Sequence, residues 1–254
     1  MSNFVRENSI VRKIWGNGDT ILFIFAGSAA EFALNKAVDW LYFTGRLPAD
    51  PLGRLFSTVA YARQIVFSEE DAALTTIDQM AKIHAGVEAK RGQTIPDWAY
   101  RDVLFMLIDY SIRAYEVLQR NLSLEEKTEV FEVFNRVGQR MGLKELPVTF
   151  EQWQVMRKVH LQQDLQKSHY TTDLYRQYRK HLGFVRYLLL LEGQKMVVPQ
   201  QVKKLLGFNS VPLLAPVLVV YKLSRKLQLD WLLKAIILPG AYKNQIRNLD
   251  RQPA

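Results

Sequence analysis

One histidine lies on the apolar face of an expected helix. In residues 76–90, TIDQMAKIHAGVEAK, helical spacing places four residues on one stripe: Ile77, Met80, His84 and Val87. Two interpretations fit this placement. His84 is either a core residue hydrogen-bonded to a neighbour, or an axial ligand of a haem iron. In the second case Nε2 binds the iron while a backbone or carboxylate acceptor holds the Nδ1 proton.

An arginine and a threonine form the second candidate pair. Arg54 and Thr58, in DPLGRLFSTVAYARQIVFS, are four residues apart and share one face of a helix. Together they could hold an anionic group or a bound oxygen species. Alternatively, Arg54 is a surface residue and Thr58 bonds its own backbone. Cations for haem propionates are available by residue type alone at Arg54, Arg63 and Lys82.

Other common catalytic patterns are missing from the sequence. None of the histidines pairs with another at the i, i+3 or i+4 spacing of a helical metal site, and there is no HExxH or ExxH motif. GxSxG, P-loop and GxGxxG motifs are absent too, so hydrolysis by a serine and a histidine has no support.

Helical patterns extend along almost the whole chain. We expect helices over residues 19–43, 51–67 and 124–141, and basic, tyrosine-rich helices over about 151–206. No strand alternation and no internal repeat appear. The pattern therefore predicts an all-α fold with a single multi-helix domain over residues 1–254.

Capping residues support these helix boundaries. Side-chain oxygens at a helix start accept from free backbone N–H groups, and a glycine often follows a helix end. The expected caps are Asp50 followed by Pro51, Ser68, a Ser123–Glu126 capping box, and Thr149 with Gln152, while Gly142 ends the helix over 124–141.

The absence of cysteine limits the chemistry. The chain has 254 residues and no cysteine, which excludes disulfides, thiolate zinc sites, iron–sulfur clusters and thiolate-ligated haem. The first 19 residues lack the apolar region of a signal peptide, and the apolar run ILFIFAGSAA is too short to span a bilayer. We therefore expect a cytoplasmic protein.

The basic charge is concentrated in the second half. Residues 1–127 carry 14 basic and 16 acidic side chains, whereas residues 128–254 carry 20 and 9, within a net charge of +9. This asymmetry favours either an ordinary basic surface or an anionic partner. In VVYKLSRKLQLDWLLKAIIL, Lys222, Arg225 and Lys226 stand beside bulky apolar residues, as in a helix that docks on an anionic membrane.

Nucleic acid is the less favoured anionic partner. Tyrosines and basic residues alternate in SHYTTDLYRQYRKHLGFVRY, a composition that suits base stacking and phosphate contact. No known nucleic-acid-binding module is present, however, and tyrosines that pack against neighbouring helices explain the same residues. We therefore expect no nucleic-acid partner.

Several motifs occur in the order found in one protein family. The pieces are GNGDTILFIFAGSAAEFALNKAV, DPLGRLFSTVAYARQIVFS with its D-P-x-x-R-x-x-x-T pattern, KIHAGV with its I-H-x-x-V pattern, LSLEE, and GLKELPVTFEQW. In this order, over about residues 17–150, they resemble the mpaB/rubber oxygenase catalytic domain family, formerly DUF2236. The basic, apolar-tailed part over 151–254 carries less of the resemblance.

The resemblance implies a fold, a cofactor and roles for the candidate residues. Relatives have an all-α, globin-like core that holds non-covalent haem b, and they use dioxygen to cleave carbon–carbon double bonds of isoprenoids. His84 matches the histidine that ligates the iron, while Arg54 and Thr58 match the arginine and threonine required around the haem.

The chain also departs from the family pattern. Many relatives have His-Pro where this chain has Asn35-Lys36, and Trp-x-His in the middle helix where this chain has Asp109 and Tyr110. Latex-clearing relatives have a lysine at the position of Ser57. For their carboxylate base, Glu31 and Asp39 are candidates by rough location.

The sequence therefore predicts a divergent haem-dependent oxygenase. Its expected partners are dioxygen and a small hydrophobic substrate, isoprenoid or lipid-like, with no oligomeric state implied. The alternative is a non-enzymatic helical protein that binds lipid or docks peripherally on an anionic membrane.

Overall fold

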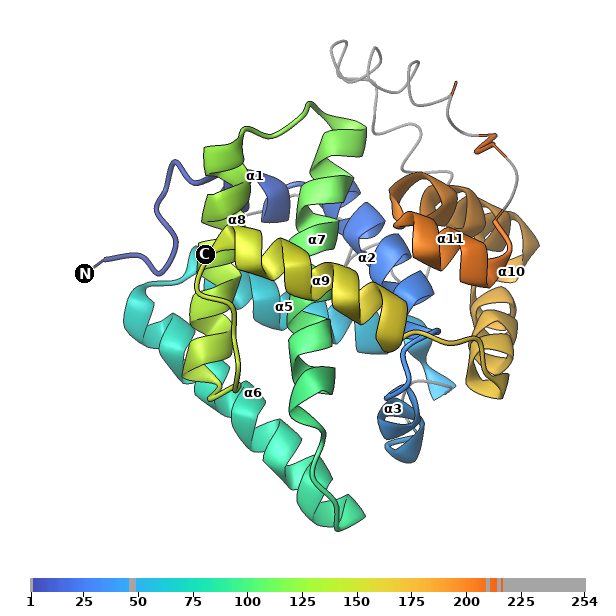
Figure 1. The fold of residues 1–254 in the computed structure, drawn as a ribbon, viewed down its shortest axis with the longest axis horizontal. Coiled ribbons are helices and arrows are strands. Elements are labelled where there is room, and N and C mark those ends of the chain that lie inside the picture. The colour runs from blue at the N-terminus through green and yellow to red at the C-terminus, as the bar shows by residue number, and fades with distance from the viewer. Residues whose placement is uncertain (1, 46–48, 209–210, 214–215, 217–254) are drawn as a thin grey trace.

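Helices form all the regular structure in the part of the chain that the structure describes. The computed structural model describes residues 2–45, 49–208, 211–213 and 216. The helices are α1 (Ile10–Trp15), α2 (Gly18–Phe32), α3 (Asp39–Phe43), α5 (Pro51–Phe67), α6 (Glu70–Arg91), α7 (Asp97–Leu118), α8 (Leu124–Arg140), α9 (Phe150–Gln163), α10 (His169–Val197) and α11 (Gln200–Leu206) (Figure 1). The predicted all-α, single-domain fold is confirmed.

Most of the predicted caps are present. Asp50 Oδ1 accepts from the backbone N–H of Gly53 at 2.8 Å, and Ser123 and Glu126 form the reciprocal capping box at the start of α8. Thr149 caps α9, and Gly142 follows α8 with a φ of 75°. These boundaries depend on neighbouring residues alone, which is why the sequence predicts them.

Two predicted boundaries are wrong. The single helix expected over 19–43 breaks after α2, because Asn35 Oδ1 accepts from the N–H of Ala37 at 2.8 Å and the N–H of Lys36 donates to the carbonyl of Asp164 at 3.0 Å. Ser68 does not cap α6. Its carbonyl instead accepts from the N–H of Phe4 at 3.2 Å, and Glu69 stands at the N-cap position.

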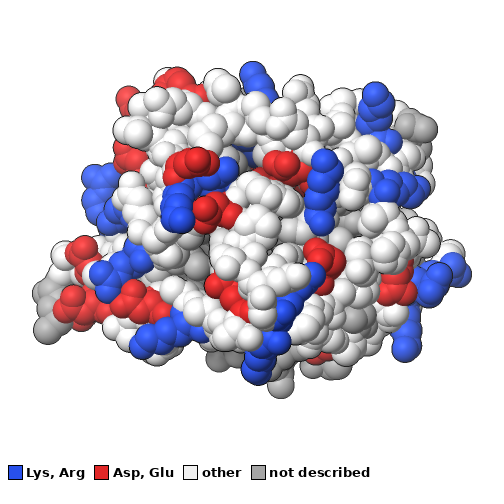
Figure 2. Space-filling model, turned by 60° about the horizontal axis from the view of Figure 1, so that its bottom comes forward, with Lys and Arg blue, Asp and Glu red and all other residues white. Residues whose placement is uncertain are grey.

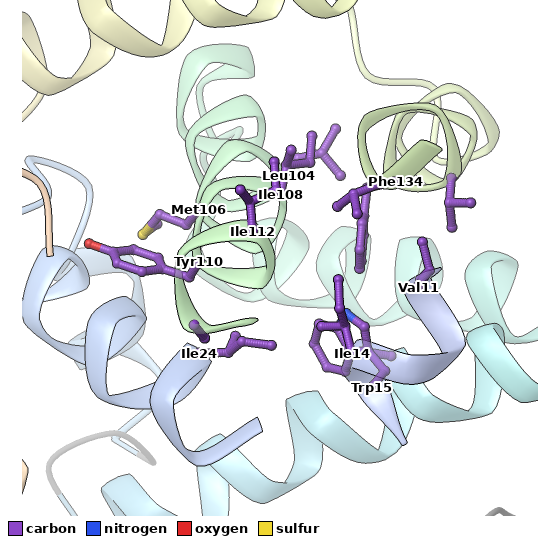
Figure 3. Close-up of a cluster of buried hydrophobic side chains, with 14 of the residues drawn as sticks. Val11, Ile14, Trp15, Ile24, Leu104, Met106, Ile108, Tyr110, Ile112 and Phe134 are labelled. Atoms are coloured by element: carbon purple, nitrogen blue, oxygen red, sulfur yellow. The ribbon is translucent and has the colours of Figure 1, made fainter. Parts of the chain in front are cut away.

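The core lies where α2 and α7 pack together. A methyl group placed on Gly27 of α2 would lie 2.3 Å from ring atoms of Tyr110 on α7, so the missing side chain allows the close approach. Trp15 packs against Phe134, with ring centroids 5.7 Å apart, and donates to Ser111 Oγ at 3.1 Å. Figure 3 shows Tyr110 at the edge of this cluster, its hydroxyl pointing away from the other labelled side chains.

The second half of α6 extends beyond this core. Its buried residues are Ala73, Thr76 and Ile77, all in the first half of the helix. In Figure 1 the end of α6 and the start of α7 meet at the lower end of the molecule. The region that carries His84 is therefore more open than the apolar stripe suggested.

The tyrosines of α10 serve packing. Tyr178 and Leu174 are buried with Ala33 and Val38 in a second, smaller apolar cluster, against which Tyr175 also packs. This agrees with the packing interpretation of the tyrosine-rich stretch. The helix is kinked at Gly183, which has a φ of 72° and a ψ of 172°.

The described residues contain no membrane-spanning helix, and the face shown in Figure 2 is not of one sign. None of their helices combines the length and the apolarity needed to cross a bilayer. Figure 2 shows acidic and basic side chains interspersed on the face that it presents. The apolar, basic stretch with Lys222, Arg225 and Lys226 lies outside the described residues.

Candidate functional site

His84 has a defined tautomer. Its Nδ1 lies 2.8 Å from the backbone carbonyl oxygen of Met80, one turn earlier in α6. A carbonyl oxygen can only accept, so Nδ1 must carry the proton, and in a neutral ring the lone pair is on Nε2. This is the form in which a histidine ligates a metal through Nε2 while a second group orients the ring.

The His84 ring is half-buried against α7. Tyr100 packs edge-on against it, with centroids 5.3 Å apart and an interplanar angle of 74°. The Tyr100 hydroxyl donates to Glu88 Oε1 at 3.2 Å, and the same oxygen accepts from the N–H of Ile95 at 2.8 Å. Burial, and then the charge of Glu88, raise the pKa of Tyr100, which keeps this phenol protonated. The ring is thus positioned by both helices.

The apolar stripe is only partly a core face. Ile77 is fully buried, but Met80, His84 and Val87 are half-buried, and the adjacent Ile83 is 50 % exposed. His84 therefore lies at the margin of the core, where a bound group could still reach it. Its role as iron ligand stays a prediction.

Arg54 and Thr58 lie on the helix that precedes α6. The structure describes the backbone of Arg54 in α5 but not its side chain, while Thr58 is half-buried. In Figure 1, α5 and α6 diverge from their connection near Ser68. At a rise of about 1.5 Å per residue, Arg54 and His84 both stand about 20 Å from that connection, and Thr58 one turn closer. Arg54 and Thr58 on α5 and His84 on α6 therefore lie on two diverging helices.

Of the other proposed propionate partners, Arg63 has a structural role. It is 5 % exposed, its Nη1 donates to the carbonyl of Trp15 at 3.0 Å, and its guanidinium lies over the Phe67 ring. Arg63 therefore holds α1 against α5. Lys82 is exposed on α6.

The two carboxylates considered as a base are both ion-paired. Asp39 accepts from Arg91 Nη2 at 2.6 Å, and the same guanidinium lies 4.0 Å from the centroid of the Trp40 ring. Glu31 is fully buried and belongs to a cluster of charged groups. Of the two, only Asp39 is partly accessible.

That cluster centres on Glu31 and Arg157. Two guanidinium nitrogens of Arg157 on α9 donate to the two carboxylate oxygens of Glu31, and its Nε and Nη2 donate to Asp109 Oδ2 at 3.0 and 2.9 Å. Tyr110 also donates to Glu31, at 2.8 Å. Burial alone would raise the pKa of Glu31, but the charge and hydrogen bonds of Arg157 lower it to about 2. The ionised form of Glu31 is therefore favoured, which makes it a poor proton acceptor.

His160 on α9 extends the cluster to Asp102 and Asp164. Its Nε2 lies 2.9 Å from Glu31 Oε1, and its Nδ1 lies 2.6 Å from Asp102 Oδ1 and 3.4 Å from Asp164 Oδ2. Burial lowers the pKa of His160, but its hydrogen bonds to Asp102 and Glu31 outweigh burial and raise it to about 9. The ring thus bridges carboxylates on both sides.

Three of the residues that depart from the family pattern meet in this cluster. Tyr110 and Asp109 bind Glu31 and Arg157 directly, and Asn35 Nδ2 donates to Asp102 Oδ2 at 3.2 Å. Sequence reasoning noted these departures without connecting them. The signals available in the sequence were two polar residues seven apart in an apolar helix, Asp102 and Asp109, and an arginine and a histidine three apart, Arg157 and His160.

Two of the hollows on the described surface are lined by residues far along the chain from His84. One, of about 470 Å³, is lined by α11 and its flanking residues, including Lys203, Lys204 and Phe208. The other, of about 520 Å³, lies between the N-terminal segment and α8, with Phe4 and Arg136 in its wall. Neither hollow includes the candidate residues.

The fold and the tautomer of His84 define an all-helical protein with a candidate metal-binding imidazole at the margin of its core. Residues 13–238 match the family described as ER-bound oxygenase mpaB/B′/Rubber oxygenase, catalytic domain. The match spans most of the chain, and the chain belongs to this family. Comparisons with curated proteins and with solved structures found no significant match.

Family membership confirms the resemblance seen in the motif order. The match extends beyond the predicted 17–150 and includes α9 and α10, which supply Arg157 and His160. Because this is a family of oxygenases, an oxygenase function is supported in general.

Proposed function

We propose that the chain is a haem b-dependent oxygenase that acts with dioxygen on a hydrophobic, isoprenoid or lipid-like substrate. Membership of an oxygenase family supports the reaction class. The observation that supports haem as the cofactor is the hydrogen bond from Nδ1 of His84 to the Met80 carbonyl, because it makes Nε2 the basic nitrogen.

The chain's own residues have distinct tasks in this proposal. Haem, when bound, supplies the chemistry of dioxygen activation. His84 holds the iron through Nε2, and the Met80 carbonyl keeps the proton on Nδ1 and fixes the ring. Tyr100 limits ring rotation from the side.

Helix α5, which diverges from α6, supplies polar groups. Helical spacing places the Thr58 hydroxyl on the face of α5 that also carries Arg54. A guanidinium pairs with a haem propionate, and a hydroxyl donates to an oxygen atom of a bound group. Such fixed donors act most strongly where apolar side chains exclude water.

An absorption spectrum tests the cofactor assignment. Protein expressed with added haem precursor should show a strong Soret band, and His84→Ala should lose it. His181→Ala is the matched control, because His181 is exposed on α10 and should leave the band unchanged. A folded His84→Ala protein, checked by circular dichroism, that retains full haem would overturn the assignment.

A second candidate function is peripheral docking on an anionic membrane. After its kink, α10 exposes three apolar side chains, Phe184 at 61 %, Val185 at 66 % and Leu188 at 43 %. Arg179 and Lys180 are exposed just before the kink. Apolar side chains beside cations suit the surface of an anionic bilayer.

A further inference from the structure

Three potential metal ligands converge at the end of α9. His160 Nδ1 and one carboxylate oxygen each from Asp102 and Asp164 all lie within 4.8 Å of one another. We propose that these residues bind a divalent cation that accepts mixed nitrogen and oxygen ligands, such as Zn²⁺ or Mn²⁺. This site is separate from His84, so the proposal does not depend on the proposed function.

Supporting groups surround two of the proposed ligands. The far nitrogen of the His160 ring, Nε2, lies 2.9 Å from Glu31 Oε1, the carboxylate–histidine arrangement that orients metal-binding imidazoles. Asp102 Oδ2 accepts from Asn35 Nδ2 at 3.2 Å, which leaves Oδ1 facing His160. Glu31 and Asn35 therefore hold His160 and Asp102 in orientation.

The backbone around Asp164 is also fixed. Its N–H donates to the His160 carbonyl at 2.9 Å, and its own carbonyl accepts from the N–H of Lys36 at 3.0 Å. Two residues on, the N–H of Gln166 donates to the carbonyl of Leu34 at 2.7 Å. Rigid support of this kind is what a preorganised metal site requires.

The charge of the cluster favours a divalent cation. Four carboxylates, Glu31, Asp102, Asp109 and Asp164, face two guanidiniums: Arg157, and Arg113, which binds Asp109 at 2.7 Å. With His160 as an imidazolium the cluster carries a formal charge of −1, and once the cation has displaced the Nδ1 proton the protein groups carry −2. A divalent cation neutralises that charge, and buried anions are stable only when they are compensated.

Binding exchanges a proton for the cation. The 2.6 Å from His160 Nδ1 to Asp102 Oδ1 is a hydrogen-bond distance, so the cation takes the place of the Nδ1 proton, which leaves to solvent. The Asp164 side chain is 27 % exposed and gives the cation a route from solvent. Water completes the coordination.

Calorimetric titration with Zn²⁺ and with Mn²⁺ tests the site in the full chain, after chelation and removal of any affinity tag. We expect one equivalent to bind, and we expect Asp164→Asn to weaken binding at least tenfold, the scale of losses seen even when supporting residues of metal sites are changed. Asp173→Asn is the matched control. Its carboxylate is similarly exposed, at 29 %, but binds Tyr42 and Arg176 instead.

A spectroscopic readout separates a built site from loose surface binding. Co²⁺ at a site with one imidazole and two carboxylates gives visible absorption bands, which Asp164→Asn should lose and Asp173→Asn should keep. Absence of saturable one-to-one binding in the wild type, or equal affinity in Asp164→Asn and wild type, would overturn the proposal.

Discussion

At the scale of single residues, the least expected feature is a cluster of charges in the protein interior. Glu31 is fully buried and Arg157 is 4 % exposed, and each depends on the other for compensation. An ion pair of this kind adds little compared with a well-packed apolar core. Removing one partner, however, leaves an uncompensated charge, which is strongly destabilising. The cluster therefore makes the fold sensitive to substitution at a few positions.

Glu31→Gln should reveal this sensitivity. The substitution removes the carboxylate that binds Arg157, His160 and Tyr110, so three buried partners lose a charged acceptor, and the free energy of unfolding should fall by about 3–5 kcal/mol in urea denaturation. Glu145→Gln is the control, because Glu145 pairs with Arg101 on the surface and is 77 % exposed. The free energy of unfolding of Glu145→Gln should differ little from that of the wild type. Equal stability of the two variants would contradict the interpretation of the cluster.

At the scale of helices, boundaries set by neighbouring residues could be predicted from the sequence, whereas those set by long-range contacts could not. The start of α5 at Asp50 and that of α8 at Ser123 could be predicted, since both caps lie within three residues of their partners. The end of α2 was not predicted, because only one of the two bonds that break the helix is local, that of Asn35 with Ala37, whereas the other comes from Asp164. In the candidate site, likewise, His84 could be selected from its spacing. The roles of Arg157 and His160 could not be predicted, because their partner Glu31 lies on another helix.

The contact between α2 and α7 gives a prediction at this scale. Gly27→Ala would place a methyl group 2.3 Å from the Tyr110 ring, so the helices must separate, and stability should fall by about 1–3 kcal/mol. Gly86→Ala, where the added methyl meets open space inside α6, should instead stabilise by about 0.5–1 kcal/mol. Thermal unfolding of both variants measures the difference. A Gly27→Ala variant as stable as the wild type would contradict this prediction and show that the two helices can move apart at little cost.

At the scale of the whole molecule, surface charge alone does not indicate a partner. The described face in Figure 2 mixes both signs, although the second half of the sequence is strongly basic. A docking surface needs apolar side chains and cations together, and α10 provides both around Gly183. This helix is therefore where the membrane alternative can be tested.

Vesicle flotation is the measurement for that alternative. If α10 docks, the protein should float with vesicles that contain anionic lipid, and the double variant Phe184→Ser, Val185→Ser should not. The control is Val155→Ser, Val159→Ser, which removes exposed valines of α9. Equal flotation of the two double variants, or none by the wild type, would exclude docking through α10.

The pairing of Glu31 with Arg157 also sets an order of events during synthesis. The two residues are 126 positions apart, so α2 leaves the ribosome long before α9 exists. At translation rates of about 5–20 residues per second, this interval is roughly 6 to 25 s. During it the Glu31 carboxylate keeps its hydration, because its compensating cation has not been made. The nascent N-terminal half therefore cannot complete its interior, and native packing of this chain must await the emergence of α9.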